Sequence, residues 1–183
     1  MSDFFSQYGV TFEQLTTFAL QGDLSSQYIL ACCYEQGVGA EQDFEKAFHW
    51  FMQCALQGDA PAQHKVGLCY DIGKGVEQSY EQAFYWYKKS ATLGNAKAQY
   101  NLASCYEEGQ GVEQDLKKAF YWYKRSAEQG VISAWCVLGY YYANGIAIEK
   151  NIEKAIYWFS LAAEQGHEDA IKNLQILKNA QGE

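Results

Sequence analysis

The sequence predicts an all-α protein: a right-handed α-solenoid of about ten helices in which helix-turn-helix repeats stack on one another. The first observation is a fixed 36-residue interval between five glycines, which are Gly22, Gly58, Gly94, Gly130 and Gly166. The second is that tryptophan recurs in the same interval, at Trp50, Trp86, Trp122 and Trp158. Such a period indicates stacked repeats, because each unit can bury its apolar face only against its neighbours.

Composition is the third observation. The 183 residues are 49% hydrophobic, which is too apolar for a disordered chain. A single proline argues against a β architecture rich in turns. Together these features favour a compact, helical protein.

The first helix of each unit is illustrated by the start of the unit 59–94. Asp59 is a suitable N-cap, and Pro61 is tolerated in a first helical turn. The apolar residues that follow recur at helical spacing and are Ala62, Val66, Cys69 and Tyr70. Glycine then ends the helix at Gly73, because it adopts the left-handed conformation that closes a helix C-terminus.

The second helix of the same unit begins after Ser79, with Gln82 at the position of a capping box. The equivalent cap positions in the other units are Asp43, Asp115 and Asn151. The residues expected to form its buried stripe are Ala83, Trp86, Tyr87 and Ser90. A hairpin of two such helices needs neighbouring hairpins to cover its apolar faces.

This register predicts a single domain over residues 1–183. Residues 11–22 form an N-terminal half-repeat, which precedes four full repeats at 23–58, 59–94, 95–130 and 131–166. Residues 167–183 form a C-terminal capping helix and tail, whose charged residues shield the last apolar face.

The repeat unit carries the motif Ala-x-x-x-(Val/Leu)-Gly-x-x-Tyr-x-x-Gly-x-Gly-Val, followed by Asp-x-x-Lys-Ala-x-x-Trp-Tyr and then Ala-Glu-Gln-Gly. This motif resembles the Sel1-like repeat, a relative of the tetratricopeptide repeat. Residues 98–130 carry it nearly in full, and the resemblance extends over roughly residues 11–180. The resemblance implies a non-catalytic adaptor or scaffold from a bacterium. The fourth repeat departs from the motif, with Ala147 at the second glycine and Val131 at the cap, so its loop is expected to differ in shape.

The resemblance also implies where a partner binds, since the first helices of related arrays line a concave groove. The expected groove residues are Tyr28, Glu35, His64, Leu68, Asp71, Tyr100, Glu107, Glu108 and Tyr140. Lys97 is the one cation found at a groove position, and it lies in phase with Ser25 and Pro61. An aromatic floor with an acidic edge favours a basic or apolar peptide or protein. The alternative is that the tyrosines cover repeat edges and the acids are solvated surface.

A second candidate surface lies on the second helices. Tyr85, Tyr121 and Tyr157, with His49 in the first repeat, point away from the tryptophan stripe. They form a ladder that faces solvent, a partner or a second copy of the chain. The alternative is that they are half-buried between stacked helices, with the hydroxyl exposed.

Several other functions are disfavoured. The formal charge of −8 argues against nucleic acid and anionic membrane surfaces as partners. The three histidines lack metal-ligand spacing, and Cys33, Cys69 and Cys105 are interpreted as small buried residues, so no metal or cofactor is expected. No Ser-x-x-Lys or phosphate-loop motif is present, which argues against a β-lactamase-like or other enzyme. The N-terminus lacks the pattern of a secretory signal, which favours a cytoplasmic location.

The sequence therefore predicts a protein-interaction module that binds a partner in the groove of its first helices. Two alternatives stay open. A small acidic module of this kind could be an immunity protein that neutralises a basic toxin, or a scaffold that forms homo-oligomers through the tyrosine ladder.

Overall fold

The computed structural model describes residues 10–181, and these residues form ten α-helices without a β-strand. The chain divides into two compact units, Met1–Asn95 and Ala96–Glu183, and each is described by itself. The first unit contains α2 (Phe12–Leu20), α3 (Leu24–Gln36), α4 (Phe44–Leu56), α5 (Ala60–Ile72) and α6 (Tyr80–Thr92). The second contains α7 (Ala96–Glu108), α8 (Leu116–Glu128), α9 (Ile132–Asn144), α10 (Ile152–Glu164) and α11 (Glu168–Gln181).

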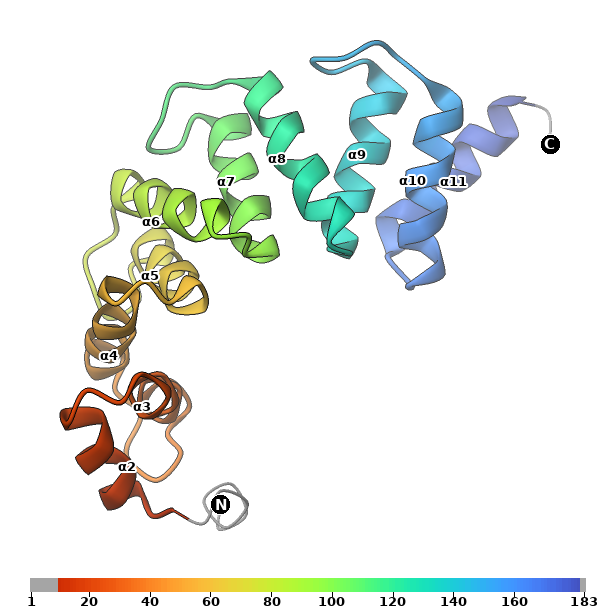
Figure 1. Ribbon diagram of the computed structural model, residues 1–183. Coiled ribbons are helices and arrows are strands. Elements are labelled where there is room, and N and C mark those ends of the chain that lie inside the picture. Colours follow the sequence, from red (N-terminus) through yellow and green to blue (C-terminus); the bar gives the residue numbers. More distant parts are fainter. Residues whose placement is uncertain (1–9, 182–183) are drawn as a thin grey trace. The chain divides into compact units, whose positions relative to one another are not determined.

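Each predicted repeat is one helical hairpin. In the first unit α3 packs on α4 and α5 on α6, while α2 packs on α3 and α4 on α5. In the second unit the hairpins are α7 with α8 and α9 with α10, and α11 packs on α10; Figure 1 shows these helices side by side in chain order. The prediction of an all-helical repeat protein is confirmed. The assignment of residues 1–183 to one domain stays a prediction.

Most helix ends follow the predicted capping pattern. The Asp59 side chain accepts a hydrogen bond from the Ala62 amide at 2.8 Å, and Asp43, Asp115 and Asn151 cap the second helices in the same way. Ser79 also caps its helix, through the Gln82 amide at 3.3 Å. Val131 makes no side-chain cap, as expected from its apolar side chain.

In the second and fourth repeats the core of the hairpin is a large ring on the second helix packed against a glycine on the first. A Cβ placed on Gly67 would lie 2.6 Å from the ring of Tyr87, and one on Gly139 would lie 2.6 Å from the ring of Phe159. Both rings are almost completely buried. The predicted stripe of Ala83, Trp86, Tyr87 and Ser90 is buried as well.

Buried polar side chains join successive helices, and the sequence analysis did not identify them. The Gln27 amide donates to the Ala19 carbonyl at 3.1 Å, and Gln63 repeats this bond 36 residues later to Ala55, also at 3.1 Å. In the last repeat the Trp135 indole replaces the glutamine and donates to the Ala127 carbonyl at 2.8 Å. Each of these carbonyls also accepts a backbone amide from the turn that follows its helix, so the side-chain bond is a second one that ties the next helix to it.

The loop of the fourth repeat was expected to differ in shape because Ala147 replaces a glycine, but its backbone at this position resembles that of the other repeats. Ala147 has φ 60°, which is close to φ 66° to 78° at the equivalent glycines Gly39, Gly75 and Gly111. The chain therefore keeps the left-handed conformation at this position although alanine adopts it at a cost. The two hydrogen bonds that flank the loop explain this, since Ile146 and Asn151 donate backbone bonds to α9 at 3.0 and 2.8 Å.

Among residues 10–181, no helix is long and apolar enough to cross a membrane.

The left-handed alanine predicts a stabilising substitution. Ala147→Gly should raise the free energy of unfolding by about 0.5–1 kcal/mol, because relief of the left-handed strain exceeds the entropy that glycine adds to the unfolded chain. Urea unfolding followed by circular dichroism measures it. As a matched control, Gly75→Ala should destabilise the protein, since its Cβ would overlap the carbonyl group of Phe44. Equal unfolding midpoints for all three proteins would contradict this account.

Candidate partner-binding surface

The predicted groove residues fall into two sets, one in each unit. Tyr28 and Glu35 lie on α3, and His64, Leu68 and Asp71 lie on α5, all in the first unit. The second unit holds the remaining four, with Tyr100, Glu107 and Glu108 on α7 and Tyr140 on α9. The two sets are considered separately.

A cavity of about 450 Å³ opens between the first turns of α3 and α5 in the first unit. Its lining residues are Leu24, Ser25, Tyr28, Ile29, Asp59 and Pro61. Tyr28 belongs to the predicted set, and Ser25 and Pro61 were expected beside it. This cavity is a hollow in the first-helix surface of the first unit.

Leu24, Ile29 and Asp59 were missed by the sequence analysis. Asp59 was interpreted as a helix cap, a role that it also performs here. Ile29 lies in phase with Lys65, Asn101 and Val137, so no shared chemistry at that position signalled a site.

The aromatic residues of the expected floor are partly engaged in packing. The ring of Tyr28 meets Phe51 edge-on at a centroid distance of 5.4 Å, and Tyr100 meets Tyr123 in the same way at 5.3 Å. His64 is buried, with its ring 5.9 Å from that of Tyr87. Leu68 is half-buried, whereas Tyr140 is 51% exposed. Tyr28 and Tyr100 therefore offer one edge to a partner while the other packs in the hairpin.

Glu35 is not a free carboxylate at the groove edge. It accepts hydrogen bonds from the ammonium groups of Lys65 at 2.7 Å and Lys74 at 3.5 Å, and 18% of its side chain is exposed. Lys97 alone was expected as a cation of this surface, whereas Lys65 on α5 also lies there. Glu35 therefore joins α3 to the next repeat and is neutralised there.

Asp71 and Glu107 bind the hydroxyls of core tyrosines. The Tyr87 hydroxyl donates to Asp71 Oδ2 at 2.9 Å. Glu107 accepts two such bonds, from Tyr123 at 2.7 Å to Oε2 and from Tyr141 at 2.8 Å to Oε1. Position 107 thus holds α8 and α9 against α7, which corrects the expectation that these acids face a partner.

Glu108 is the exposed acid of the predicted set, and its carboxylate accepts a bond from Ser104 at 3.3 Å. Because the other three acids are engaged within their own unit, the surface of the first helices is less acidic toward a partner than the sequence suggested. What the first unit offers is mainly apolar and aromatic contact.

Burial sets the protonation of Tyr28 at the cavity and of two core thiols in the same helices. Removal from water, reinforced by the negative charges of Cys32, Asp59 and Glu35, raises the pKa of Tyr28 to about 12. Burial also raises the pKa of the Cys33 and Cys69 thiols to about 11. These groups are therefore neutral at physiological pH and suited to packing and hydrogen bonding.

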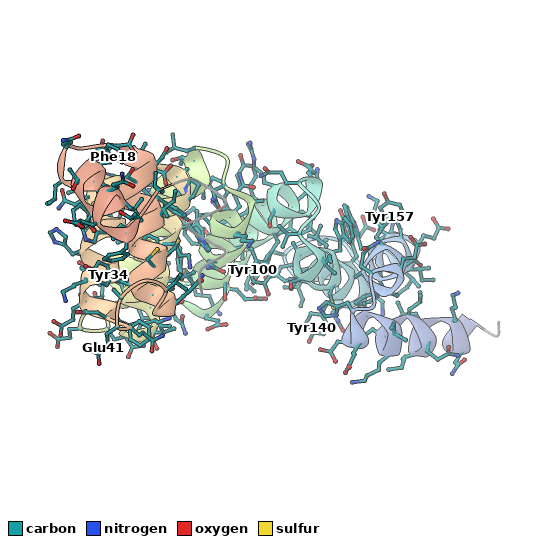
Figure 2. The ribbon with its side chains drawn as sticks, turned by 90° about the horizontal axis from the view of Figure 1, so that it is seen from below. Phe18, Tyr34, Glu41, Tyr100, Tyr140 and Tyr157 are labelled. Atoms are coloured by element: carbon teal, nitrogen blue, oxygen red, sulfur yellow. The ribbon has the colours of Figure 1, made fainter. Side chains whose placement is uncertain are left out.

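The tyrosine ladder of the second helices is exposed, as one of the two interpretations of the sequence expected. Tyr85, Tyr121 and Tyr157 are 46%, 50% and 56% exposed, and each packs edge-on against the tryptophan that follows it. In the second unit Tyr140 on α9 and Tyr157 on α10 lie on different sides (Figure 2). The first-helix surface and the ladder are thus separate surfaces.

Within residues 10–181, no three His, Cys, Asp or Glu side chains are grouped as a metal site would require.

The role of Glu107 predicts a stability difference between two adjacent acids. Glu107→Ala should lower the free energy of unfolding by about 2–4 kcal/mol, because two tyrosine hydroxyls lose their acceptor. Glu108→Ala, the matched control, should change it by less than about 0.5 kcal/mol, since Glu108 is exposed. Chemical unfolding followed by tyrosine and tryptophan fluorescence measures both. If both substitutions changed the free energy of unfolding by similarly small amounts, Glu107 would instead be assigned to the surface that faces a partner.

The raised pKa of Tyr28 predicts a loss of stability at alkaline pH. The folded state keeps this phenol neutral while the unfolded chain ionises near pH 10, so its stabilising contribution is complete below pH 10 and is lost as the pH rises toward about 12. Tyr28→Phe should therefore show a smaller drop in melting temperature between pH 9 and 11.5 than the wild type. Tyr157→Phe, which removes an exposed hydroxyl, should behave like the wild type. If the melting temperatures of all three proteins fell in parallel as the pH rose, the raised pKa of Tyr28 would be contradicted.

Comparison with known proteins gives a consistent result. The model of the Sel1 repeat matches four successive segments, residues 24–59, 60–95, 96–131 and 136–167. A protective antigen of uropathogenic Escherichia coli with an SLR fold is 37% identical, with a TM-score of 0.91 over 94% of this chain. This chain covers 37% of that structure, so it spans little more than a third of its length.

Other solved structures share the fold. A Sel1 repeat protein from Oxalobacter formigenes is 32% identical with a TM-score of 0.81, over 88% of this chain and 67% of that one. An immunity protein from Pseudomonas aeruginosa is 22% identical with a TM-score of 0.56, over 87% of this chain and 59% of that one. No match was found among curated proteins. With four matched repeats that coincide with the four helical hairpins, the chain belongs to the Sel1 repeat family.

Proposed function

We propose that this chain is a protein-interaction module that binds a segment of a partner protein on the first-helix surface of its first unit. Sel1 repeat proteins typically mediate contacts between proteins, which supports the general class. The observation that carries the specific proposal is the cavity between α3 and α5. Concave, mostly apolar hollows with few polar groups are where binding sites occur in proteins.

The lining of the cavity indicates what it binds. Leu24, Ile29 and Pro61 provide apolar walls, and the half-buried ring of Tyr28 provides the aromatic one. An aliphatic or aromatic side chain of the partner fits this environment and would be the central anchor of the interface. The anchor gains its binding energy from removal of apolar surface from water.

Charge has a smaller part than the sequence suggested. Asp59 lies at the rim, but its carboxylate already accepts the Ala62 amide at 2.8 Å, and Glu35 is paired with two lysines. We therefore favour an apolar anchor over a basic peptide. A cationic residue beside the anchor would approach Asp59 and contribute mainly to the association rate.

The location that we propose is the cytoplasm. Cys33, Cys54, Cys69 and Cys105 are buried thiols, which behave as small apolar residues of the core. This use of cysteine is compatible with a reducing compartment.

An immunity protein that neutralises a toxin is a second candidate. The Pseudomonas aeruginosa immunity proteins share the fold at 22% identity, and that likeness extends to the fold alone. The acidic charge of −8 supports the idea, because it would speed association with a basic toxin. A neighbouring toxin gene whose product binds this chain would favour it over a general adaptor.

The cavity predicts where a partner can be cross-linked. A photoreactive residue in place of Ser25, at the cavity, should cross-link a partner in the native cell, and the same residue in place of Glu45 on α4 should not. In a second variant, Ser25→Trp should fill the cavity and reduce partner binding by about tenfold or more, since it removes the site of the anchor. Circular dichroism checks that the variant is folded.

Three outcomes are informative. Cross-linking of one partner at position 25 that Ser25→Trp abolishes would support the proposal. Equal cross-linking from positions 25 and 45 would contradict it. A photoreactive residue at Tyr85 that cross-links a second copy of the chain would instead favour self-association through the exposed tyrosines.

A further inference from the structure

The second unit contains a cavity of about 320 Å³ beside the loop that joins α9 to α10. Its apolar walls are Phe120 on α8, Tyr142 on α9 and Ile148 in the loop. Its polar lining is contributed by Glu149, Lys150, Asn151 and Lys154. No residue of this cavity belongs to the groove that the sequence predicted.

Lys154 occupies a position that recurs in the repeats with the same geometry. Its ammonium lies 5.3 Å from the ring centre of Tyr142, as Lys118 lies 5.3 Å from Tyr106. In the first unit Lys46 lies 5.4 Å from Tyr34 in the equivalent place. The fold therefore holds a cation over a tyrosine ring at this point in three of its four repeats.

The counter-ion of that cation is missing in the last repeat. Lys46 pairs with the capping residue Asp43 at 2.9 Å, and Lys118 pairs with the cap Asp115 at 3.0 Å. The cap of α10 is Asn151, whose neutral side chain accepts the Lys154 amide at 2.8 Å and brings no charge. Within the described part of the chain, Lys154 forms no ion pair.

A second cation replaces a structural glutamine at the same place. In the first three repeats the glutamines that precede the caps donate to carbonyls of the first helix, with distances of 2.9 Å from Gln42, 2.6 Å from Gln78 and 2.7 Å from Gln114. In the fourth repeat this residue is Lys150, which is exposed. Glu149 is the opposing charge, but each repeat has a glutamate there, so it does not distinguish this loop.

We propose that this cavity is an anion-binding site that takes the carboxylate of an apolar C-terminal residue of a partner protein, in which the charge is carried beside an apolar group. The carboxylate supplies the negative charge that Asp43 and Asp115 supply in their own repeats, and it lies beside the Asn151 side chain, within reach of Lys150 and Lys154. The apolar group packs against Phe120, Tyr142 and Ile148. Two lysines beside an apolar wall supply both the charge and the contact area that such a group needs.

Phenylacetate is a minimal probe for this site, because it joins one carboxylate to one apolar ring. In nuclear magnetic resonance titrations it should shift the backbone amide signals of residues 148–154 in a saturable way. Phenylacetamide, which has the same shape without the charge, should not. Raised salt should weaken the binding, since both lysines are exposed and their charges are screened.

Variants that restore the sequences of the other repeats give the sharpest test. Asn151→Asp supplies the carboxylate from within the chain and should weaken phenylacetate binding by about fivefold or more. Lys150→Gln combined with Lys154→Gln should abolish it. Lys118→Gln, which removes the equivalent but paired lysine of the third repeat, should leave it unchanged. All of these residues have counterparts at the same position elsewhere in the chain or lie on its surface, so the variants should fold.

The proposal is overturned if phenylacetate leaves the signals of residues 148–154 unmoved, or if the double lysine variant binds it as well as the wild type. An equal response to inorganic phosphate would also overturn the assigned ligand, because the apolar walls would then contribute nothing. Loss of binding in Asn151→Asp with full helicity would support it most directly.

Discussion

The packing of one large ring against one small residue sets the geometry of every hairpin in which it is seen. Gly67 and Gly139 leave no room for a Cβ, because the rings of Tyr87 and Phe159 lie against their backbones. This contact brings the two helices of a hairpin closer than side chains of ordinary size would allow. The identity of the ring then decides which kind of side chain is needed beside it. Where the ring is tyrosine, its hydroxyl needs an acceptor inside the hairpin.

That requirement explains the acids on the first helices. Asp71 accepts the hydroxyl of Tyr87, and Glu107 accepts those of Tyr123 and Tyr141. In the fourth repeat the ring is Phe159, and the position equivalent to Glu107 is Ala143. In the first repeat the ring is Phe51 and the acid Glu35 pairs with lysines instead. Three of the four carboxylates that resemble a binding edge in the sequence, Glu35, Asp71 and Glu107, therefore have partners within their own unit.

The two cavities are lined partly by positions that depart from the repeat. The α3–α5 cavity is lined partly by Ile29, whose equivalents share no chemistry. The cavity of the second unit is lined by Lys150, which replaces the glutamine of the other repeats, and by Asn151, which replaces the aspartate cap of the first and third repeats. Many side chains at repeated positions make the contacts that stack the helices. A side chain at a position that departs from the repeat is not needed for these contacts.

The sequence by itself determined the helices, their order, their caps and the hairpin as the unit of the fold, because a 36-residue phase repeated four times is a strong local signal. It placed Tyr28 at the first-helix surface, but it could not show that Glu35, Asp71 and Glu107 already have partners. Those partners lie up to 39 residues away in the chain, as Lys74 does from Glu35. Likewise, the left-handed Ala147 follows from bonds on either side of its loop. Side-chain pairing across helices depends on distances that only the packed structure sets, and for this reason tertiary structure decided which acids and lysines remain available.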